Sequence, residues 1–167
     1  MSLDLFIKSK ICLSVMGNAI MVLKADKKDY KKAYKKHYEA YNILYRNNDC
    51  IISRRLLLVY SVECGLKYKL LNEWRVNNPE KIFNNVNDPR HGVIKSHCLK
   101  KILKELGQAG TFRFPKNIKT QHGQGVDDVN YHEMCRYGVE AKREYEDSEK
   151  SYEELLCRIA KWIEGEL

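Results

Sequence analysis

The sequence is poor in the residues that interrupt helices. It has only three prolines and nine glycines among 167 residues, and helix interiors tolerate few of either. Hydrophobic residues make up 44% and charged residues 31% of the chain, which is typical of a globular rather than a disordered protein. An apolar run at residues 11–23 contains Asn18 and is too short to span a bilayer. We therefore predict one domain over residues 1–167, mostly α-helical and without a membrane span.

The sequence also lacks the motifs that identify common cofactor sites. It has no G-x-x-x-x-G-K-[ST] loop, no G-x-G-x-x-G turn and no C-x-x-C pair among its six cysteines. Apolar helical patterns surround three of the cysteines: Cys64, Cys98 and Cys157. We expect these thiols to be reduced and buried, in a cytoplasmic protein. The side chains nearest to a zinc ligand set, without paired spacing, are His97, Cys98, His132 and Cys135. We expect neither a metal nor another cofactor.

Hydrophobic periodicity predicts helices joined by polar breaks. The expected helices cover about residues 5–24, 29–46, 50–74, 93–106 and 147–163, with a short helix at 131–141. Asp29 is the expected cap of the second helix, and Gly107 the expected end of the fourth. Residues 77–90 and 109–129 are expected to be loops, since neither shows a helical or an alternating pattern.

Positive charge exceeds negative charge. Lys and Arg number 30 against 22 Asp and Glu, a formal charge of +8, which attracts phosphate polymers or forms a solvated face. Six lysines form a basic ridge: Lys27, Lys28, Lys31, Lys32, Lys35 and Lys36. In the same segment, tyrosines recur every three or four residues: Tyr30, Tyr34, Tyr38, Tyr41 and Tyr45. This stripe predicts core packing or a dimer seam, with base stacking as the alternative.

Three residues are candidates for site chemistry. Glu63 projects with an apolar stripe, which leaves two alternatives for its carboxylate. It is either half-exposed at the edge of the stripe, or buried near a functional site and paired with an arginine. Arg90 and His97 enclose six residues. An arginine can hold a phosphate while a nearby histidine accepts the proton of a ribose 2′-hydroxyl. A capping or packing role for His97 is the alternative.

Several segments together resemble the HEPN family of helical domains. Residues 60–67, YSVECGLK, look like that family's helix with a Glu and a Lys four residues apart. Residues 97–103, HCLKKIL, look like its H-D-L-x-x-L-L segment, with Cys98 in the place of Asp. Residues 136–138, RYG, resemble the step before its last helix. The resemblance spans about residues 29–167 and leaves residues 1–25 as an N-terminal helical extension.

The resemblance implies an up-and-down bundle of about five helices. Many members of the family are metal-independent ribonucleases with an Arg–His pair, and they commonly form dimers; others bind nucleotides or proteins. We therefore expect an RNA- or nucleotide-binding module of a prokaryotic defence or toxin–antitoxin system, acting as a homodimer or with an antitoxin or another defence protein. The alternatives are an endoribonuclease toxin using Arg90 and His97 as catalytic residues, and a protein-interaction adaptor. The expected phosphate- or RNA-binding residues are Glu63, Lys67, Lys100, Arg113, Lys116, Lys119, Arg136 and Tyr137.

Overall fold

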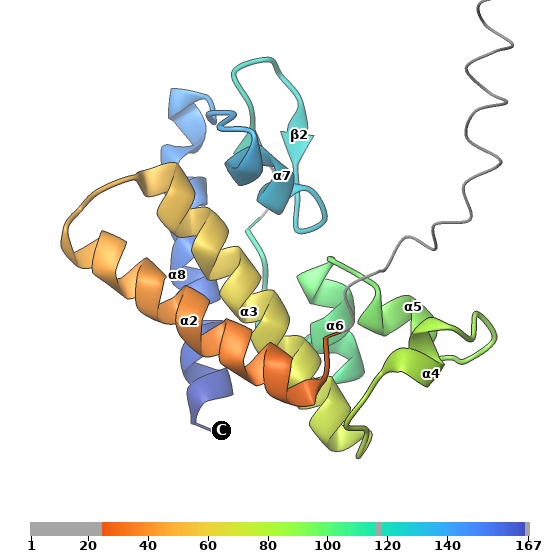
Figure 1. Ribbon diagram of the computed structural model, residues 1–167. Helices are drawn as coiled ribbons and strands as arrows, with labels where there is room; N and C mark the ends of the chain where they lie inside the picture. The colour runs from red at the N-terminus through yellow and green to blue at the C-terminus, as the bar shows by residue number, and fades with distance from the viewer. Residues whose placement is uncertain (1–24, 116–117, 166–167) are drawn as a thin grey trace, which may run out of the picture.

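Three long helices build the body of the protein (Figure 1). The computed structural model describes residues 25–115 and 118–165. Within them lie the long helices α2 (Lys27–Arg46), α3 (Ile51–Glu73) and α8 (Glu146–Glu164). The shorter elements are α4 (Glu80–Phe83), α5 (His91–Ile94), α6 (Leu99–Glu105), β1 (Ile118–Lys119), β2 (Gly125–Val126), α7 (Tyr131–Arg136) and the 3₁₀ helix η1 (Arg143–Tyr145). The chain is thus mostly helical, as expected. The helix predicted at 5–24, Cys12 and Lys116 lie outside the described residues.

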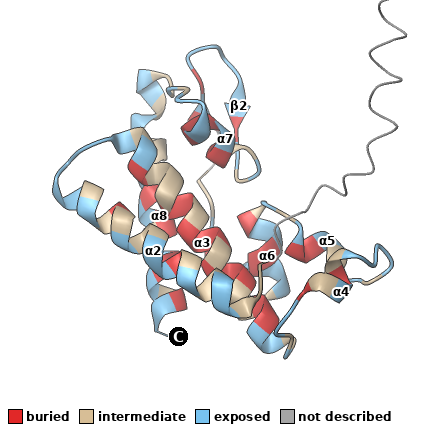
Figure 2. Cartoon of the chain, in the orientation of Figure 1, coloured by how far each residue is buried: buried red, intermediate tan, exposed pale blue. Residues whose placement is uncertain are grey.

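α3 is the central helix. It packs against α2, α6, α7 and α8, and Figure 2 shows buried residues along much of its length. Its bounds agree with the predicted 50–74 because its apolar residues continue at helical spacing from Leu58 to Leu71, all the way through the core. α8 likewise agrees with the predicted 147–163.

α2 begins earlier than the sequence pattern predicted. The Asp26 carboxylate accepts a hydrogen bond from the backbone N–H of Asp29 at 2.9 Å, and the Asp29 carboxylate accepts one from the N–H of Asp26 at 3.0 Å. This reciprocal capping box makes Asp26 the N-cap and puts Asp29 inside the first turn. The predicted cap at Asp29 was therefore wrong by one turn.

The middle of the tyrosine stripe belongs to the core. Tyr34 and Tyr41 are buried, and both hydroxyls donate to α8: Tyr34 to the carbonyl of Ala160 at 2.8 Å, and Tyr41 to the carboxylate of Glu153 at 3.2 Å. Tyr45, at the end of the stripe, is 54% exposed. Tyr34 and Tyr41 therefore pack α2 against α8 within one chain, and their hydroxyls bond to α8 instead of water.

The predicted helix at 93–106 is divided in two. α5 ends at Ile94 and α6 begins at Leu99, with Cys98 in an extended conformation between them (φ −74°, ψ 103°). The Ser96 hydroxyl accepts a hydrogen bond from the backbone N–H of Cys98 at 3.1 Å, which offers the backbone an alternative to the helix. Gly107, with φ +68°, ends α6 as predicted.

Three further predictions were corrected. The expected loop at 77–90 contains α4. The expected loop at 109–129 contains a small antiparallel hairpin in which Ile118 pairs with Val126, and its turn includes Gly123 at φ +81°. The strands are too short to show alternation in the sequence. α7 ends at Arg136, before the predicted 141.

The cysteines differ from expectation in burial. The five described cysteines are free thiols, but Cys64, Cys98 and Cys157 are only half-buried, and Cys135 is the buried one. Over the ranges that the structure describes, no helix combines the length and the apolar character needed to cross a bilayer.

Candidate functional site

A buried carboxylate lies at the centre of the candidate site. Glu63 on α3 is 8% exposed, and Lys67, one turn later, is 5% exposed. The Lys67 ammonium donates to Glu63 Oε1 at 2.8 Å. The expectation that Glu63 is buried with a partner is met, but the partner is a lysine of the same helix and not an arginine. A buried ion pair is costly to desolvate, so its presence in the central helix calls for a reason beyond packing.

His97 reaches the same carboxylate from the junction between α5 and α6. Its Nδ1 lies 3.0 Å from Oε1 and 3.1 Å from Oε2 of Glu63. The His97 side chain is 60% exposed, whereas that of Glu63 is 10% exposed. The interruption of the helix at residues 95–98 is what lets this side chain turn back onto α3. A buried acid therefore holds a solvent-facing imidazole.

The charge on Glu63 determines the His97 tautomer. Burial alone raises the pKa of the Glu63 carboxyl, but the attraction of Lys67 and the hydrogen bonds from Lys67 and His97 outweigh it and hold the pKa below its ordinary value. An ionised carboxylate only accepts hydrogen bonds, so we assign the proton of a neutral His97 ring to Nδ1. Nε2 then carries the free lone pair, which can accept a hydrogen bond or a proton.

A second histidine fixes the plane of this ring. His132 on α7 is 9% exposed, and its ring lies against that of His97 with centroids 5.6 Å apart and planes at 27°. Next to His97, the Cys98 thiol donates to Asp128 Oδ2 at 3.0 Å. Burial and the neighbouring Asp128 raise the pKa of this thiol, so Cys98 is a hydrogen-bond donor and a poor nucleophile. These contacts leave His97 little rotational freedom.

Arg136 lies one helical turn from this cluster. It follows His132 by four residues on α7, and its Nε and Nη2 donate to the Tyr60 hydroxyl at 3.1 and 2.8 Å. Tyr60 precedes Glu63 by three residues, so the backbones of these two residues are offset by about 5 Å along the axis of α3. No carboxylate among the described residues pairs with Arg136, and the side chain is exposed. Arg136 is therefore an exposed cation on α7, the helix that also carries His132.

Arg90 is anchored away from Glu63, near the C-terminal end of α3. Its Nε and Nη2 donate to the two carboxylate oxygens of Asp88 at 2.9 and 2.7 Å, and its guanidinium lies 5.7 Å from the centre of the Trp74 ring. Trp74 follows Glu63 by eleven residues, which corresponds to about 16 Å along the helix. Within one chain, therefore, the structure fastens Arg90 and His97 to separate anchors and does not bring them together.

The other residues assigned to phosphate or RNA binding are dispersed. Their positions are Lys100 on α6, Arg113 before the hairpin, Lys119 on β1 and Tyr137 after α7; all are exposed. Within residues 25–115 and 118–165, no side-chain hydrogen bond or ion pair is recorded between any of them and Glu63, His97 or His132. They provide surface charge and one exposed ring, not a built site.

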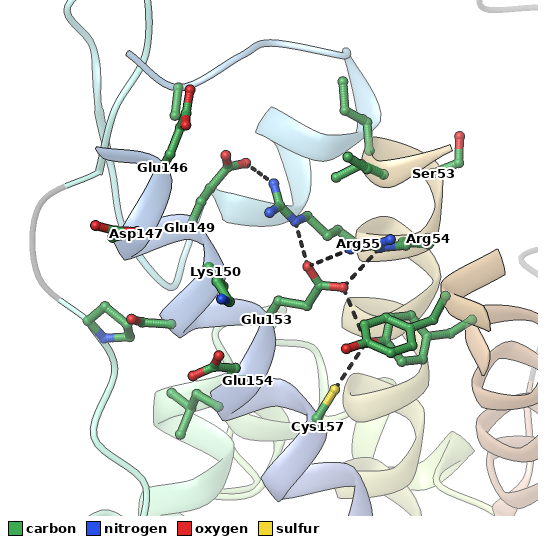
Figure 3. A pocket seen from close by; sticks show the side chains of 18 of the residues that line it. Ser53, Arg54, Arg55, Glu146, Asp147, Glu149, Lys150, Glu153, Glu154 and Cys157 are labelled. Atoms are coloured by element: carbon green, nitrogen blue, oxygen red, sulfur yellow. Dashed lines mark hydrogen bonds and ion pairs between the residues drawn. The ribbon is translucent and has the colours of Figure 1, made fainter. Parts of the chain in front are cut away.

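A second charged cluster was missed by the sequence reasoning. Figure 3 shows it in an open groove bordered by α2, α3 and α8. Glu153, 5% exposed, accepts from Arg54 Nε at 3.1 Å and from Arg55 Nε at 2.9 Å, and Arg55 also pairs with Glu149 at 2.6 Å. The adjacent arginines at 54 and 55, inside an apolar helix, were the available signal. Two arginines balance two glutamates here, so the cluster ties α3 to α8 and leaves no net charge for a ligand.

The zinc alternative has no support in the geometry. Across the described ranges, no three His, Cys, Asp or Glu side chains are arranged to hold a metal ion. Burial raises the pKa of the Cys135 thiol to about 12, and the rings of His97 and His132 stack on each other rather than converging on one point.

Comparisons of the chain with protein-family models, with curated proteins and with solved structures found no match. The proposed function therefore depends on the geometry of the His97 cluster.

Proposed function

We propose that the protein is an RNA- or nucleotide-binding module that engages phosphate-bearing ligands at the His97 cluster. The observation that carries the proposal is an exposed imidazole, that of His97, whose Nδ1 is held by the buried carboxylate of Glu63. Packing alone does not require the buried Glu63–Lys67 pair that holds it, because a helix can fill the same space with apolar side chains at no electrostatic cost. Orienting contacts of this kind are typical of functional sites.

The overall charge supports an anionic ligand. The chain carries +8, and several lysines of α2 are exposed, among them Lys32, Lys35 and Lys36. Such a surface attracts a phosphate polymer over about 8 Å at physiological salt, while the His97 cluster supplies directed contacts. The HEPN-like resemblance of residues 60–67, 97–103 and 136–138 agrees with this proposal, since these segments contribute Glu63, His97 and Arg136. In that case the protein acts in the cytoplasm, within a defence or toxin–antitoxin system.

The test is binding of a labelled single-stranded RNA of mixed sequence, followed by fluorescence anisotropy while salt is raised from about 50 mM. We expect binding that weakens with salt, with a log–log slope of about 0.7 for each phosphate neutralised. His97→Ala should weaken binding, whereas His122→Ala, which removes an exposed histidine in the hairpin turn, should not. Undetectable binding at the lowest salt, or equal effects of the two variants, would contradict the proposal.

A metal-independent endoribonuclease toxin is the second candidate. The Glu63-oriented His97, with its free Nε2, is the arrangement expected of a general base, which favours this function. Arg90 is engaged by Asp88 in the same chain, so a catalytic Arg90–His97 pair would have to form across a homodimer. Cleavage of RNA in EDTA that His97→Ala and Arg90→Ala each abolish, together with a dimer in light scattering, would establish it. A protein that stays monomeric at all concentrations would exclude this catalytic pair. An adaptor role remains for a protein that binds no RNA.

A further inference from the structure

The His97 ring is arranged as a nucleophile that faces solvent. Its side chain is 60% exposed, and its Nδ1 lies 3.0 and 3.1 Å from the two carboxylate oxygens of Glu63. Because Nδ1 carries the proton, the lone pair of Nε2 is free, and no hydrogen bond to Nε2 is recorded within the described ranges. A nucleophile whose orientation is fixed by a second group is the general pattern for covalent group transfer.

Glu63 favours the product of an attack by Nε2 over the starting ring. When Nε2 gives its lone pair to an electrophile, the imidazole becomes a cation and shares its positive charge with Nδ1. The ionised carboxylate then contacts a cation instead of a neutral ring, so this hydrogen bond strengthens as the new bond forms. Lys67 donates to the same carboxylate at 2.8 Å, and its attraction keeps Glu63 ionised.

The other histidines do not share this combination. All five histidines of the chain lie within the described ranges. His132 is 9% exposed, Nε2 of His91 is buried, and His37 is half-buried with its ring against that of a tyrosine. His122 is exposed in the hairpin turn, but no side-chain hydrogen bond to it is recorded there. His122 is therefore the natural reference for an ordinary surface imidazole.

The charge of the chain favours an anionic electrophile. At a formal charge of +8, the protein attracts anions, and phosphoryl donors are anionic electrophiles that imidazole nitrogen attacks. The neighbouring thiol does not compete, because Cys98 donates to Asp128 at 3.0 Å and its pKa is raised by burial and by that carboxylate. Transfer from a phosphoramidate, such as the phosphohistidine of another protein, moves the phosphoryl group between two nitrogens and is therefore close to balanced in free energy.

We propose that His97 is a phosphorylation site, in which Nε2 accepts the phosphoryl group of a phosphoramidate donor and Glu63 is the positioning residue. The lone pair of Nε2 forms the new N–P bond. The N–P bond of the donor breaks, and the donor nitrogen, already protonated, leaves with the electron pair as a neutral base. The His97 ring keeps its Nδ1 proton throughout.

The modification also gives the site a means of regulation. A phosphoryl group on Nε2 puts negative charge where the proposed ligand carries its phosphates, so phosphorylated His97 should repel that ligand. This consequence rests on the proposed function, whereas the phosphorylation itself does not.

Phosphorylation is tested by adding phosphoramidate itself to the full chain near neutral pH. Peptide mass spectrometry under alkaline conditions, in which the N–P bond survives, gives the rates at His97 and His122 in the same molecules. We expect His97 to react about tenfold faster, the factor that one hydrogen bond to a charged group supplies, and NMR to place the phosphoryl group on Nε2. Equal rates at the two histidines, or a product phosphorylated on Nδ1, would overturn the proposal.

The role of Glu63 is tested in a chain that carries both Glu63→Gln and Lys67→Met, because glutamine alone leaves the lysine without a counter-charge. The amide can still accept a hydrogen bond from Nδ1 but has no charge, so the rate at His97 should fall toward that at His122, whose own rate should not change. Glu39→Gln, at an exposed position on α2, is the control and should leave the ratio of the two rates unchanged. An unchanged ratio in the double variant, folded by circular dichroism, would overturn the role of Glu63.

The regulatory consequence is measured on His122→Ala, in which the exposed reference histidine is removed. Anisotropy of the labelled RNA should show weaker binding by the phosphorylated chain than by the same chain before treatment. Equal binding would overturn the regulation and leave the phosphorylation site standing. Absence of RNA binding before treatment would overturn the proposed function and this consequence, while the rates at His97 and His122 decide the phosphorylation site independently.

Discussion

Substitution of Glu63 by glutamine should destabilise the protein through the lysine that it leaves behind. Lys67 is 5% exposed, and Glu63 is its ion-pair partner among the described residues. Glu63→Gln keeps the size of the side chain but removes the counter-charge, and an ammonium stranded in this way costs about 3–5 kcal/mol. The free energy of unfolding of a domain is only about 5–15 kcal/mol, so the loss should be easy to measure.

The assay is urea unfolding followed by circular dichroism, with thermal melting as a second readout. At about 2–4 °C per kcal/mol for a chain of this size, Glu63→Gln should lower Tm by roughly 6–20 °C. Glu39→Gln, at an exposed position on α2, is the matched control and should change stability by less than about 0.5 kcal/mol. An effect of Glu63→Gln as small as that of the control would refute the reasoning.

A second substitution identifies the cause. Lys67→Met in the Glu63→Gln background removes the stranded charge and keeps an unbranched side chain, so the double variant should recover more than about 1 kcal/mol of the loss. No recovery would mean that the loss came from the His97 hydrogen bonds or from packing. If the double variant folds well but binds RNA poorly, the role of Glu63 in the site is separated from its role in stability.

The same pair gives a pH dependence with a defined sign. The pKa of Glu63 is lower in the folded protein than its ordinary value of 4.5, so the folded state favours the ionised carboxylate. Its contribution to stability is complete above pH 4.5 and is lost as the pH falls through the folded pKa. The difference in unfolding free energy between wild type and Glu63→Gln should therefore be constant near neutrality and shrink below pH 4.5. A difference that grows below that pH would contradict the assignment.

Three further changes should move the urea midpoint in stated directions. Gly65→Ala puts a methyl group 2.7 Å from Cδ2 of the buried Tyr34 ring. The overpacking cost of about 1–3 kcal/mol should exceed the gain of about 1 kcal/mol in helix propensity, so the midpoint should fall. A raised midpoint would contradict this expectation. Glu153→Gln removes the carboxylate that two arginines share and should cost about 3 kcal/mol, so an unchanged midpoint would show that the cluster is solvated. Cys98→Ser should stabilise by about 1 kcal/mol, because a hydroxyl oxygen accepts hydrogen bonds from the backbone N–H groups of Lys100 and Lys101 more strongly than the thiol sulfur does and can still donate to Asp128; a lowered midpoint would contradict this expectation.

The long helices could be predicted from the sequence because tertiary packing agrees with local pattern there. In α3 and α8 the apolar stripe continues without interruption and every turn meets a neighbouring helix, so the predicted ends fall within about two residues of the observed ones. The interruption at residues 95–98 could not be predicted this way. The pattern from Val93 to Leu106 suits one helix, and the helix is divided by the local Ser96 hydrogen bond and by the long-range contact of His97 with Glu63.

The candidate site could be predicted from the sequence only in part. The position of Glu63 in an apolar stripe predicted either a half-exposed or a buried acid, and the structure shows the buried alternative. Its partners did not follow, because Lys67 lies within reach on any helix and His97 comes from another element. Arg90 and His97 are near in sequence, yet a loop and a helix break separate them in space, so that their proximity along the chain carried no geometric information.

The site lies where two local rules are broken together. A buried ion pair in the central helix is less stabilising than apolar packing would be, and an interrupted helix forfeits hydrogen bonds that a continuous one would make. Each would be a defect alone, but each supplies what the other needs: the interruption brings the His97 ring to α3, and the Glu63–Lys67 pair gives it an ionised acceptor at 3.0 Å. Local rules that are broken together at one place are expected at functional sites. The helix break and the Glu63–Lys67 pair together orient the imidazole of His97, which is the central group of the proposed site.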